Sequence, residues 1–420
     1  MRNQVAPLRE RVTGSTCTLC QKHFAELDLL TCPECGEKGI LDIEFNYDVI
    51  KKDLTKESLA ANDERSIWRY LPLLPVEGKD IEHTLRVGNT PLYESERLGK
   101  EWGLGKLYIK DDGVNPTGSL KDRASAVAVI RAKELGYETI SCSSTGNAAS
   151  SCAGNAARLG LKTVIFVPER APEGKLAQLL IFGAKVVSVI GDYKATFDLS
   201  KAAISHYGWY NRNAGINPVM SEGKKTVSLE IAEQLNFEPT DWVACSVGDG
   251  CTIGGVYTGF KDLYELGLIK KIPRILGVQS TGCKPFVDAA ALPQPVLVPA
   301  EENTLADSIA VGIPRNPNKA LRAVRESNGK WIAVSDDDIL DMMRVLGRNE
   351  GVFGEPAGVT ATAGVLAAVK QGIIKQGETV TTISTGSGLK DVKNALLAAG
   401  KSTRLEPSLE ALEASGLLDK

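Results

Sequence analysis

The chain has 420 residues, of which 43% are hydrophobic and 24% are charged, and its formal net charge is −3. These values are typical of a globular protein of about two or three domains with an ample core. A net charge so close to zero gives no indication of a nucleic-acid-binding surface. No apolar stretch is long enough to span a membrane, and Met1–Gly14 lack the apolar run of a signal peptide, so we expect a cytoplasmic protein without nucleic-acid or membrane partners.

Four of the nine cysteines form two Cys-x-x-Cys pairs near the N-terminus. Cys17 and Cys20 are followed, after eleven intervening residues, by Cys32 and Cys35. Two tight turns of this kind bring four thiolates onto one tetrahedral ion, and zinc is the usual metal. We therefore predict a zinc ribbon over residues 1–45, in which a structural Zn²⁺ replaces an apolar core. A ribbon without metal and an iron site are the alternatives.

Beyond the ribbon, residues 42–74 are rich in charge, and we expect them to wrap around the core as helix and loop. Segments of strand character then recur with helical segments between them, at residues 106–110, 139–142, 162–167, 184–189, 241–245, 274–278 and 379–384. Such alternation is typical of parallel sheets covered by helices, so the predicted fold class is α/β. Ligands of such sheets bind outside the carboxyl ends of the strands.

One lysine stands directly behind a hydroxyl-rich turn. The run from Asn115 to Arg123 reads Asn-Pro-Thr-Gly-Ser-Leu-Lys-Asp-Arg and places Lys121 at the start of a predicted helix. A desolvated lysine loses its proton readily and can attack an aldehyde, so Lys121 is a candidate for holding an aldehyde cofactor. An ordinary strand–turn–helix connection with a solvated lysine is the alternative, and this run alone does not decide between the two.

Three further polar turns follow predicted strands. Residues 143–149 form a hydroxyl-rich turn before a helix, which suits a carboxylate or phenolate oxygen. Residues 247–255 are rich in glycine, which lets successive N–H groups converge on a phosphate. The last turn, residues 385–390, follows the strand segment at 379–384. Singly, each turn is also explained as a helix cap or a tight connection.

Together with Gly88-Asn89-Thr90-Pro91-Leu92 and Glu355-Pro356-Ala357, these segments resemble the fold-type II pyridoxal-phosphate enzymes, and among them most closely the threonine synthases. The resemblance implies two domains that each contain a parallel sheet, with pyridoxal 5′-phosphate (PLP) in the cleft between them. It also implies a large domain from residues 46–119 and 215–420, a smaller inserted domain from residues 120–214, and a homodimer. Some threonine synthases carry a similar N-terminal ribbon.

The resemblance assigns the cofactor's contacts residue by residue. It makes Lys121 the lysine that forms the Schiff base with PLP and Asn147 the partner of the phenolic oxygen. Ser384 or Thr385 would face the pyridine nitrogen. Glu355 would line the ring edge, although an acid at a helix N-terminus is the alternative. The phosphate of the cofactor would be held by the glycine-rich turn, at Gly248, Asp249, Gly250, Cys251 and Thr252.

The resemblance also implies substrate contacts. Lys110 matches a lysine that binds the substrate phosphate in the family, and the hydroxyl-rich turns would contribute Thr117, Ser119, Ser144 and Thr145. An arginine that the family places before a Glu-Gly-x-Lys-Thr run is replaced here by Met220. Either Lys224 or Arg212 compensates for it, or the substrate carries its charge elsewhere.

The implied activity is the conversion of O-phosphohomoserine and water to threonine and phosphate. The alternative keeps PLP but changes the reaction to β-elimination or β-replacement on serine, threonine or O-phosphoserine, as in dehydratases and cysteate synthase. A third hypothesis, a zinc-ribbon or cofactor-binding protein without turnover, disagrees with the presence of Lys121, Asn147 and the glycine-rich turn.

Overall fold

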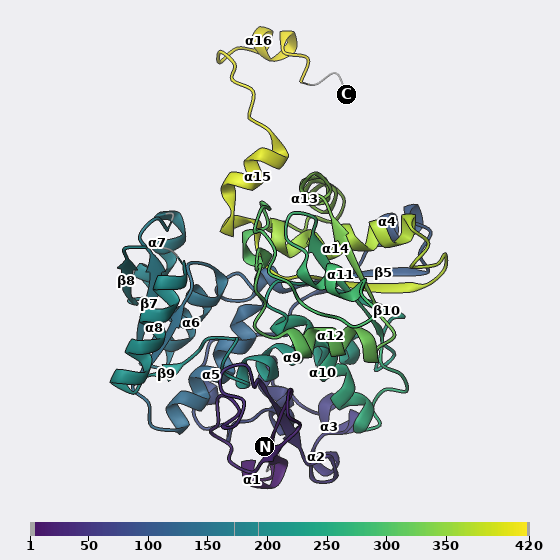
Figure 1. The fold of residues 1–420 in the computed structure, drawn as a ribbon. Helices are drawn as coiled ribbons and strands as arrows, with labels where there is room; N and C mark the ends of the chain where they lie inside the picture. The colour runs from purple at the N-terminus through teal and green to yellow at the C-terminus, as the bar shows by residue number, and fades with distance from the viewer. Residues whose placement is uncertain (1–4, 172, 192, 418–420) are drawn as a thin grey trace.

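The computed structural model describes residues 5–171, 173–191 and 193–417, which form three β-sheets with helices packed around them (Figure 1). The first sheet is a small antiparallel ribbon in the order β2-β1-β3. Its elements are α1 (Leu8–Arg11), β1 (Val12–Cys17), β2 (His23–Phe24) and β3 (Leu41–Phe45). Arg11 is fully buried, and its guanidinium donates hydrogen bonds to the backbone carbonyls of Leu71, Pro72, Leu74 and Val76. This side chain ties the ribbon to the segment that follows.

That segment consists of short helices. They are α2 (Tyr47–Asp53), α3 (Lys56–Ala60), and the 3₁₀ helices η1 (Ile67–Leu73) and η2 (Ile81–His83). Asn46 and Thr55 cap the first two of them through their side chains, as short polar residues do at helix N-termini. The prediction of helix and loop over residues 42–74 is confirmed except at its start, where β3 continues to Phe45.

The second sheet has six strands in the order β12-β11-β10-β13-β5-β4. They are β4 (Leu92–Glu94), β5 (Lys106–Asp111), β10 (Trp242–Ser246), β11 (Arg274–Ser280), β12 (Lys330–Val334) and β13 (Thr379–Ser384). All neighbouring pairs are parallel except β4–β5. We call this sheet the large sheet.

Both faces of the large sheet are buried, because side chains alternate between two apolar layers. Trp242 and Ala244 of β10 pack in the core cluster that contains α13 and α14, whereas Val243 and Cys245 pack in the cluster of α10 and α12. The helices around this sheet are α4 (Glu96–Glu101), η3 (Asp112–Val114), α9 (Val219–Gln234), α10 (Cys251–Glu265), α11 (Pro285–Ala290), η4 (Asp307–Ile309), α12 (Pro317–Glu326), α13 (Asp336–Glu350), α14 (Pro356–Lys370), η5 (Gly388–Lys390) and α15 (Val392–Ala399).

The third sheet is parallel throughout, in the order β8-β7-β6-β9, and we call it the small sheet. Its elements lie to one side of the large sheet in Figure 1. They are α5 (Lys121–Glu134), β6 (Thr139–Ser143), α6 (Asn147–Arg158), β7 (Lys162–Pro168), α7 (Glu173–Ile181), β8 (Lys185–Val189), α8 (Tyr193–Tyr207) and β9 (Tyr210–Asn211). The predicted α/β fold is thereby confirmed.

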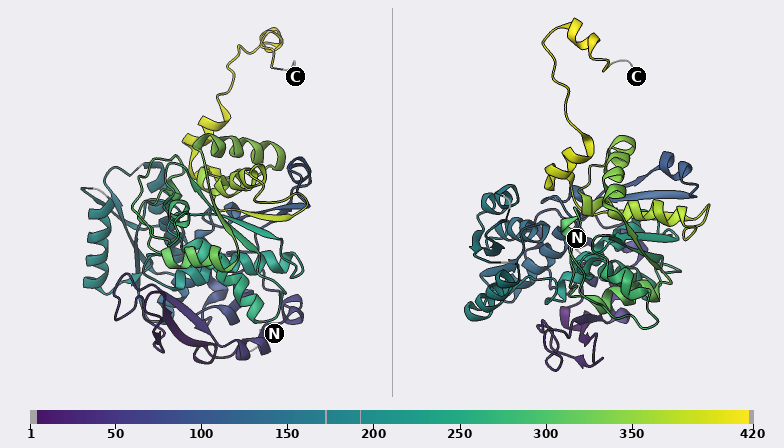
Figure 2. Two further views of the ribbon diagram at one scale, coloured as in Figure 1. Left: turned by 45° about the vertical axis from the view of Figure 1, so that its right-hand side comes forward. Right: turned by 45° about the horizontal axis from the view of Figure 1, so that its top comes forward.

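The chain ends in an arm that leaves the body of the molecule, as the views of Figure 2 show. The arm, residues 401–417, contains one short helix, α16 (Leu409–Ala414), which has no buried residue. Each hydrogen bond that the arm makes with described residues joins two residues of the arm itself. Across the described ranges of the chain, we find no helix with the length and apolar character needed to cross a membrane.

Candidate active site

The predicted site segments lie where parallel strands end. The turns after β5 and β13 are joined by two backbone hydrogen bonds: Leu120 donates to the carbonyl of Thr385 at 2.9 Å, and Ser387 donates to that of Gly118 at 3.0 Å. The turn after β6 contributes Asn147, the first residue of α6. Because β5 and β13 are parallel in the large sheet and β6 is parallel to its neighbours in the small sheet, the carboxyl ends within each sheet meet at one edge, and the side chains of these turns converge there.

Lys121 opens α5 and is partly accessible. Burial of its ammonium, together with the positive charges of Lys224 and Arg212, lowers the pKa of Lys121 to about 8 against the opposing effect of Glu355. About a tenth of the amine is therefore unprotonated at pH 7, far more than for an ordinary lysine. In that state the nitrogen can attack an aldehyde or accept a proton.

Asn147 and Glu355 meet across the site. The side-chain amide of Asn147 donates to Glu355 Oε1 at 2.7 Å, and the backbone N–H of Glu355 donates to the carbonyl of Gly386 at 2.9 Å. Burial raises the pKa of the Glu355 carboxyl, while Lys121 and the Asn147 amide act in the opposite direction. A Cβ at position 386 would lie 2.3 Å from Glu355 Oε1, so only glycine permits this close approach.

The glycine-rich turn has the properties of an oxyanion cradle. Gly250 adopts φ = 88° directly before α10, and the N–H groups of Gly248, Asp249 and Gly250 donate to none of the residues that the structure describes. The Asp249 carboxylate accepts a hydrogen bond from the N–H of Arg315 at 2.7 Å, so its contribution to the cradle would come from its backbone. The turn, with the start of α10 at Cys251 and Thr252, therefore fits the phosphate of PLP.

Ser384 fits the position opposite a pyridine nitrogen. Its hydroxyl is fully buried and has no hydrogen-bond partner among the residues described in the structure. A buried hydroxyl without a partner is costly, and a ligand nitrogen would satisfy it. Thr385 is also buried, and its carbonyl accepts the N–H of Leu120.

Two expected substrate contacts are engaged elsewhere in the protein. The ammonium of Lys110 is fully buried and lies 2.8 Å from each of three acceptors, on Thr90, Gln234 and Glu230. The Thr117 hydroxyl donates to Asp122 at 2.8 Å. All three ammonium donors of Lys110 and the hydroxyl proton of Thr117 are therefore used, and this geometry does not support either side chain as a phosphate or substrate ligand.

The other three hydroxyl residues differ in accessibility. Ser119 is fully buried, and its hydroxyl accepts the N–H of Lys121 at 3.4 Å. Ser144 accepts the N–H of Gly146 at 3.2 Å, and Thr145 is half-buried without a hydrogen bond to described residues. Ser144 and Thr145 are the two that stay accessible to a substrate.

Sequence reasoning missed a buried ionic cluster beneath the site. The Arg123 guanidinium bridges Asp112 and Glu230 at 2.6 Å and 2.7 Å, and Glu230 also pairs with Lys110. These charges hold the pKa of the Glu230 carboxyl well below its usual range, against the effect of its burial. The only signal in the sequence is that Glu230 lies three residues after Val227, on the buried face of α9.

The four ribbon cysteines meet at one point. The Sγ atoms of Cys17, Cys20, Cys32 and Cys35 lie within 4.8 Å of one another. Backbone N–H groups of Leu19 and Cys35 donate to the sulfur atoms of Cys17 and Cys32, each at 3.4 Å, as they do in knuckles that bind metal through thiolates. The donor set is therefore suited to a closed tetrahedral Zn²⁺ site.

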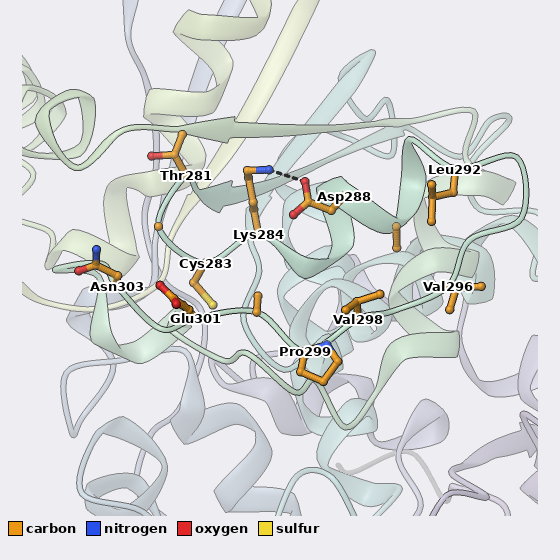
Figure 3. A pocket seen from close by; sticks show the side chains of 13 residues that line it. Thr281, Cys283, Lys284, Asp288, Leu292, Val296, Val298, Pro299, Glu301 and Asn303 are labelled. Carbon is orange, nitrogen blue, oxygen red and sulfur yellow. Dashed lines mark hydrogen bonds and ion pairs between the residues drawn. The ribbon is translucent and has the colours of Figure 1, made fainter.

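A separate cavity of about 580 Å³ lies beside α11 (Figure 3). It is lined by residues between Thr281 and Asn303, and Lys284 pairs with Asp288 at its wall. None of the residues that line it belongs to the site around Lys121.

Comparisons with known proteins agree with this geometry. Residues 83–386 match the family model described as pyridoxal-phosphate dependent enzyme. The threonine synthase of Methanocaldococcus jannaschii is 38% identical over 94% of this chain and 98% of its own length, and that of a Synechocystis species is 38% identical over 82% of this chain and 89% of its own. The chain belongs to the threonine synthase family. The predicted family and the prediction of a PLP-dependent enzyme are thus confirmed.

Solved structures confirm the fold of this threonine synthase family member at lower identity. A processed threonine deaminase isoform 2 from Solanum lycopersicum superposes with a TM-score of 0.65 at 21% identity, covering 81% of this chain and 95% of that one. An O-ureido-L-serine synthase gives the same TM-score at 18% identity, covering 80% and 99% of the two chains. Identities this low show a shared architecture only.

Proposed function

We propose that this protein is a PLP-dependent lyase that converts O-phosphohomoserine and water to threonine and phosphate. The observation that carries the proposal is Lys121, whose amine has a pKa lowered to about 8 among residues that fit each polar group of the cofactor. Lys121 would hold the aldehyde carbon, Asn147 the phenolic oxygen, and Ser384 or Thr385 the ring nitrogen. The turn from Gly248 to Thr252 would hold the phosphate.

When bound, PLP supplies an electron sink that makes protons on the substrate's Cα and Cβ easier to remove. Lys121 would remove the Cα proton, move a Cβ proton to Cγ and finally return a proton to Cα, because the amine that would hold the cofactor is partly unprotonated. During the reaction the Cγ–O bond breaks, phosphate leaves with the electron pair, and Cγ gains a proton. The hydroxyl of water adds at Cβ, which has lost one proton.

Five wider assignments belong to this proposal. Residues 46–119 and 215–420 form the large domain and residues 120–214 the small one, which agrees with the division of the strands between two sheets. A structural Zn²⁺ is bound by the four ribbon cysteines. The active protein is a homodimer located in the cytoplasm, and it acts on a small amino acid.

A second candidate activity is favoured by one observation. Met220 is fully buried on α9, so the position where a phosphate-binding arginine is expected carries no charge. A lyase acting on serine, threonine or O-phosphoserine would not need this cation for a γ-phosphate.

The two candidates are separated by substrate choice. The purified protein, loaded with PLP, is incubated with O-phosphohomoserine, O-phosphoserine, serine or threonine while phosphate, threonine, ammonia and keto acid are measured. We expect phosphate and threonine in equal amounts from O-phosphohomoserine, with kcat/KM about 100-fold or more above that for serine. Ammonia and keto acid released from serine or threonine at a comparable rate would establish the second candidate instead.

A further inference from the structure

Two cations beside Lys121 are buried without a described carboxylate at ion-pair distance, although burial raises the pKa of the Asp249 carboxyl and the charge of Lys224 acts against that rise. Lys224 is 3% exposed and Arg212 1% exposed. Within the part of the chain that the structure describes, Lys224 makes neither a hydrogen bond nor an ion pair, and the side chain of Arg212 donates only to the hydroxyls of Ser125 and Ser151. Burying an unpaired charge costs free energy unless a ligand supplies the opposite charge.

Three other fully buried cations in this chain do have carboxylate partners. Lys225 lies 2.6 Å from Glu222 and 2.7 Å from Asp262, and Lys110 lies 2.8 Å from Glu230. Arg123 is paired twice, as described above. A fourth, Arg11, donates instead to several backbone carbonyls. Lys224 and Arg212 have neither a carboxylate nor a backbone carbonyl as a side-chain partner among the described residues.

Both charges lie close enough to Lys121 to lower the pKa of its amine, and they come from different elements of the fold. Arg212 follows β9, and its guanidinium lies 2.9 Å from the hydroxyl of Ser125, which stands one turn after Lys121 on α5. Lys224 is on α9 and packs against the N-terminal part of α10, since a Cβ at Gly255 would lie 3.1 Å from that of Lys224. The small-sheet side and the large-sheet side of the site each provide one positive charge.

The register of α9 connects Lys224 with Met220. Residues four apart on a helix lie on the same face. Lys224 therefore stands one turn after Met220, the apolar residue at the position where a phosphate-binding arginine is expected. A lysine reaches farther than most side chains and holds its charge at the end of a flexible stem. An ammonium at position 224 can thus serve the same space as a guanidinium at position 220.

We propose that Lys224 and Arg212 together bind the phosphate of the substrate, with Lys224 taking the place of a cation at position 220. This inference rests on the proposed function. The N–H groups of the glycine-rich turn serve the phosphate of the cofactor, and the two side-chain cations serve the phosphate that leaves from Cγ. When the Cγ–O bond breaks, both charges stabilise the departing dianion.

The test uses the PLP-loaded protein with inorganic phosphate as the probe, and follows binding by the change in cofactor absorbance. Lys224→Gln and Arg212→Gln should each weaken phosphate binding about 10- to 100-fold while the amount of bound PLP stays unchanged. They should also raise KM for O-phosphohomoserine more than they lower kcat. Lys270→Gln, an exposed lysine, is the charge-matched control and should change neither value.

Rescue variants keep the test informative if a glutamine variant does not fold. Lys224→Arg should retain phosphate binding, and Met220→Arg combined with Lys224→Gln should restore it. The proposal is overturned if Lys224→Gln binds phosphate like the parent, or if it loses PLP instead of phosphate. If the parent binds phosphate through these residues but does not turn over O-phosphohomoserine, the proposed function fails and the anion site stands.

Discussion

At the scale of single residues, the reactivity of Lys121 depends on charges of opposite sign held at fixed places. Lys224 and Arg212 lower the pKa of its amine and Glu355 raises it, in addition to the effect of burial. The buried thiol of Cys245 is the remaining titratable group among these neighbours. The balance among these groups sets the pH at which the amine becomes a nucleophile.

This balance predicts opposite shifts for two variants. In the cofactor-free protein, the rate at which PLP becomes linked to Lys121 should rise as pH increases through about 8, because only the unprotonated amine attacks the aldehyde. Lys224→Gln removes a neighbouring positive charge, so the profile should move to higher pH. Glu355→Gln removes a negative charge and should move it to lower pH.

The measurement follows cofactor absorbance after mixing at each pH, and borohydride reduction with peptide mapping checks that Lys121 carries the label. Lys270→Gln should leave the profile in place. Shifts of both variants in the same direction would show that local charge does not govern this amine.

At the scale of elements, α5 and α9 approach each other closely at a glycine. A Cβ on Gly223 would lie 2.4 Å from the backbone carbonyl of Arg123 and 2.6 Å from Cα of Ala124. These are backbone atoms that a rotamer change cannot move. The position of α5, and of Lys121 at its start, therefore depends on the absence of a side chain at position 223.

Two glycine-to-alanine variants test this dependence. Gly223→Ala should lower the free energy of unfolding by about 1–3 kcal/mol, because the helices must separate, and it should also slow PLP linkage to Lys121. Gly347 lies on the exposed face of α13, and an added Cβ there would have no atom within 4 Å. Gly347→Ala should therefore raise the free energy of unfolding by about 0.5–1 kcal/mol, because alanine favours the helix more than glycine does. Thermal unfolding monitored by circular dichroism measures both. Equal effects of the two variants would contradict the close packing at Gly223.

Strands and site were not equally predictable from the sequence. The strands β5, β6, β7, β10, β11 and β13 were predicted within about two residues, because each is an apolar run between polar turns. The edge strand β12 was missed, since Lys330–Val334 is short and half-exposed. The engagement of Lys110 was also missed. Its partner Glu230 is 120 residues away, and only the packing of α9 beneath β5 brings the two charges together.

At the scale of the whole molecule, the ribbon connects the helices of both larger sheets. Asp28 and Glu37 pair with Arg131 of α5 and Lys201 of α8, beside the small sheet. Asp42, at the other side of the ribbon, pairs with Lys319 and Arg322 of α12, beside the large sheet. The ribbon therefore contacts helices beside both sheets without contributing a residue to the site.

Loss of the proposed zinc should consequently lower the thermal stability of the protein while the site around Lys121 still binds PLP. Elemental analysis should find one zinc per chain. The Cys32→Ser variant should contain no zinc and should have a lower melting temperature. The cofactor absorbance at moderate temperature should persist, because no residue that fits PLP lies in the ribbon. Cys283→Ala, at a buried cysteine outside the ribbon, should keep the zinc. Immediate loss of PLP on chelation, with no change in folding, would assign the metal a role in the reaction.

The C-terminal arm has a consequence for handling the protein. Lys401 and Arg404 are exposed and lie outside any helix, between α15 and α16, and the arm makes hydrogen bonds only within itself. A protease needs an extended, unattached backbone, so trypsin should cut at these two residues before it reaches the body. The trimmed protein should keep its PLP, its metal and its melting temperature. It should also be less prone to self-association, because Leu409 and Leu417, which are 73% and 50% exposed, are removed with the arm.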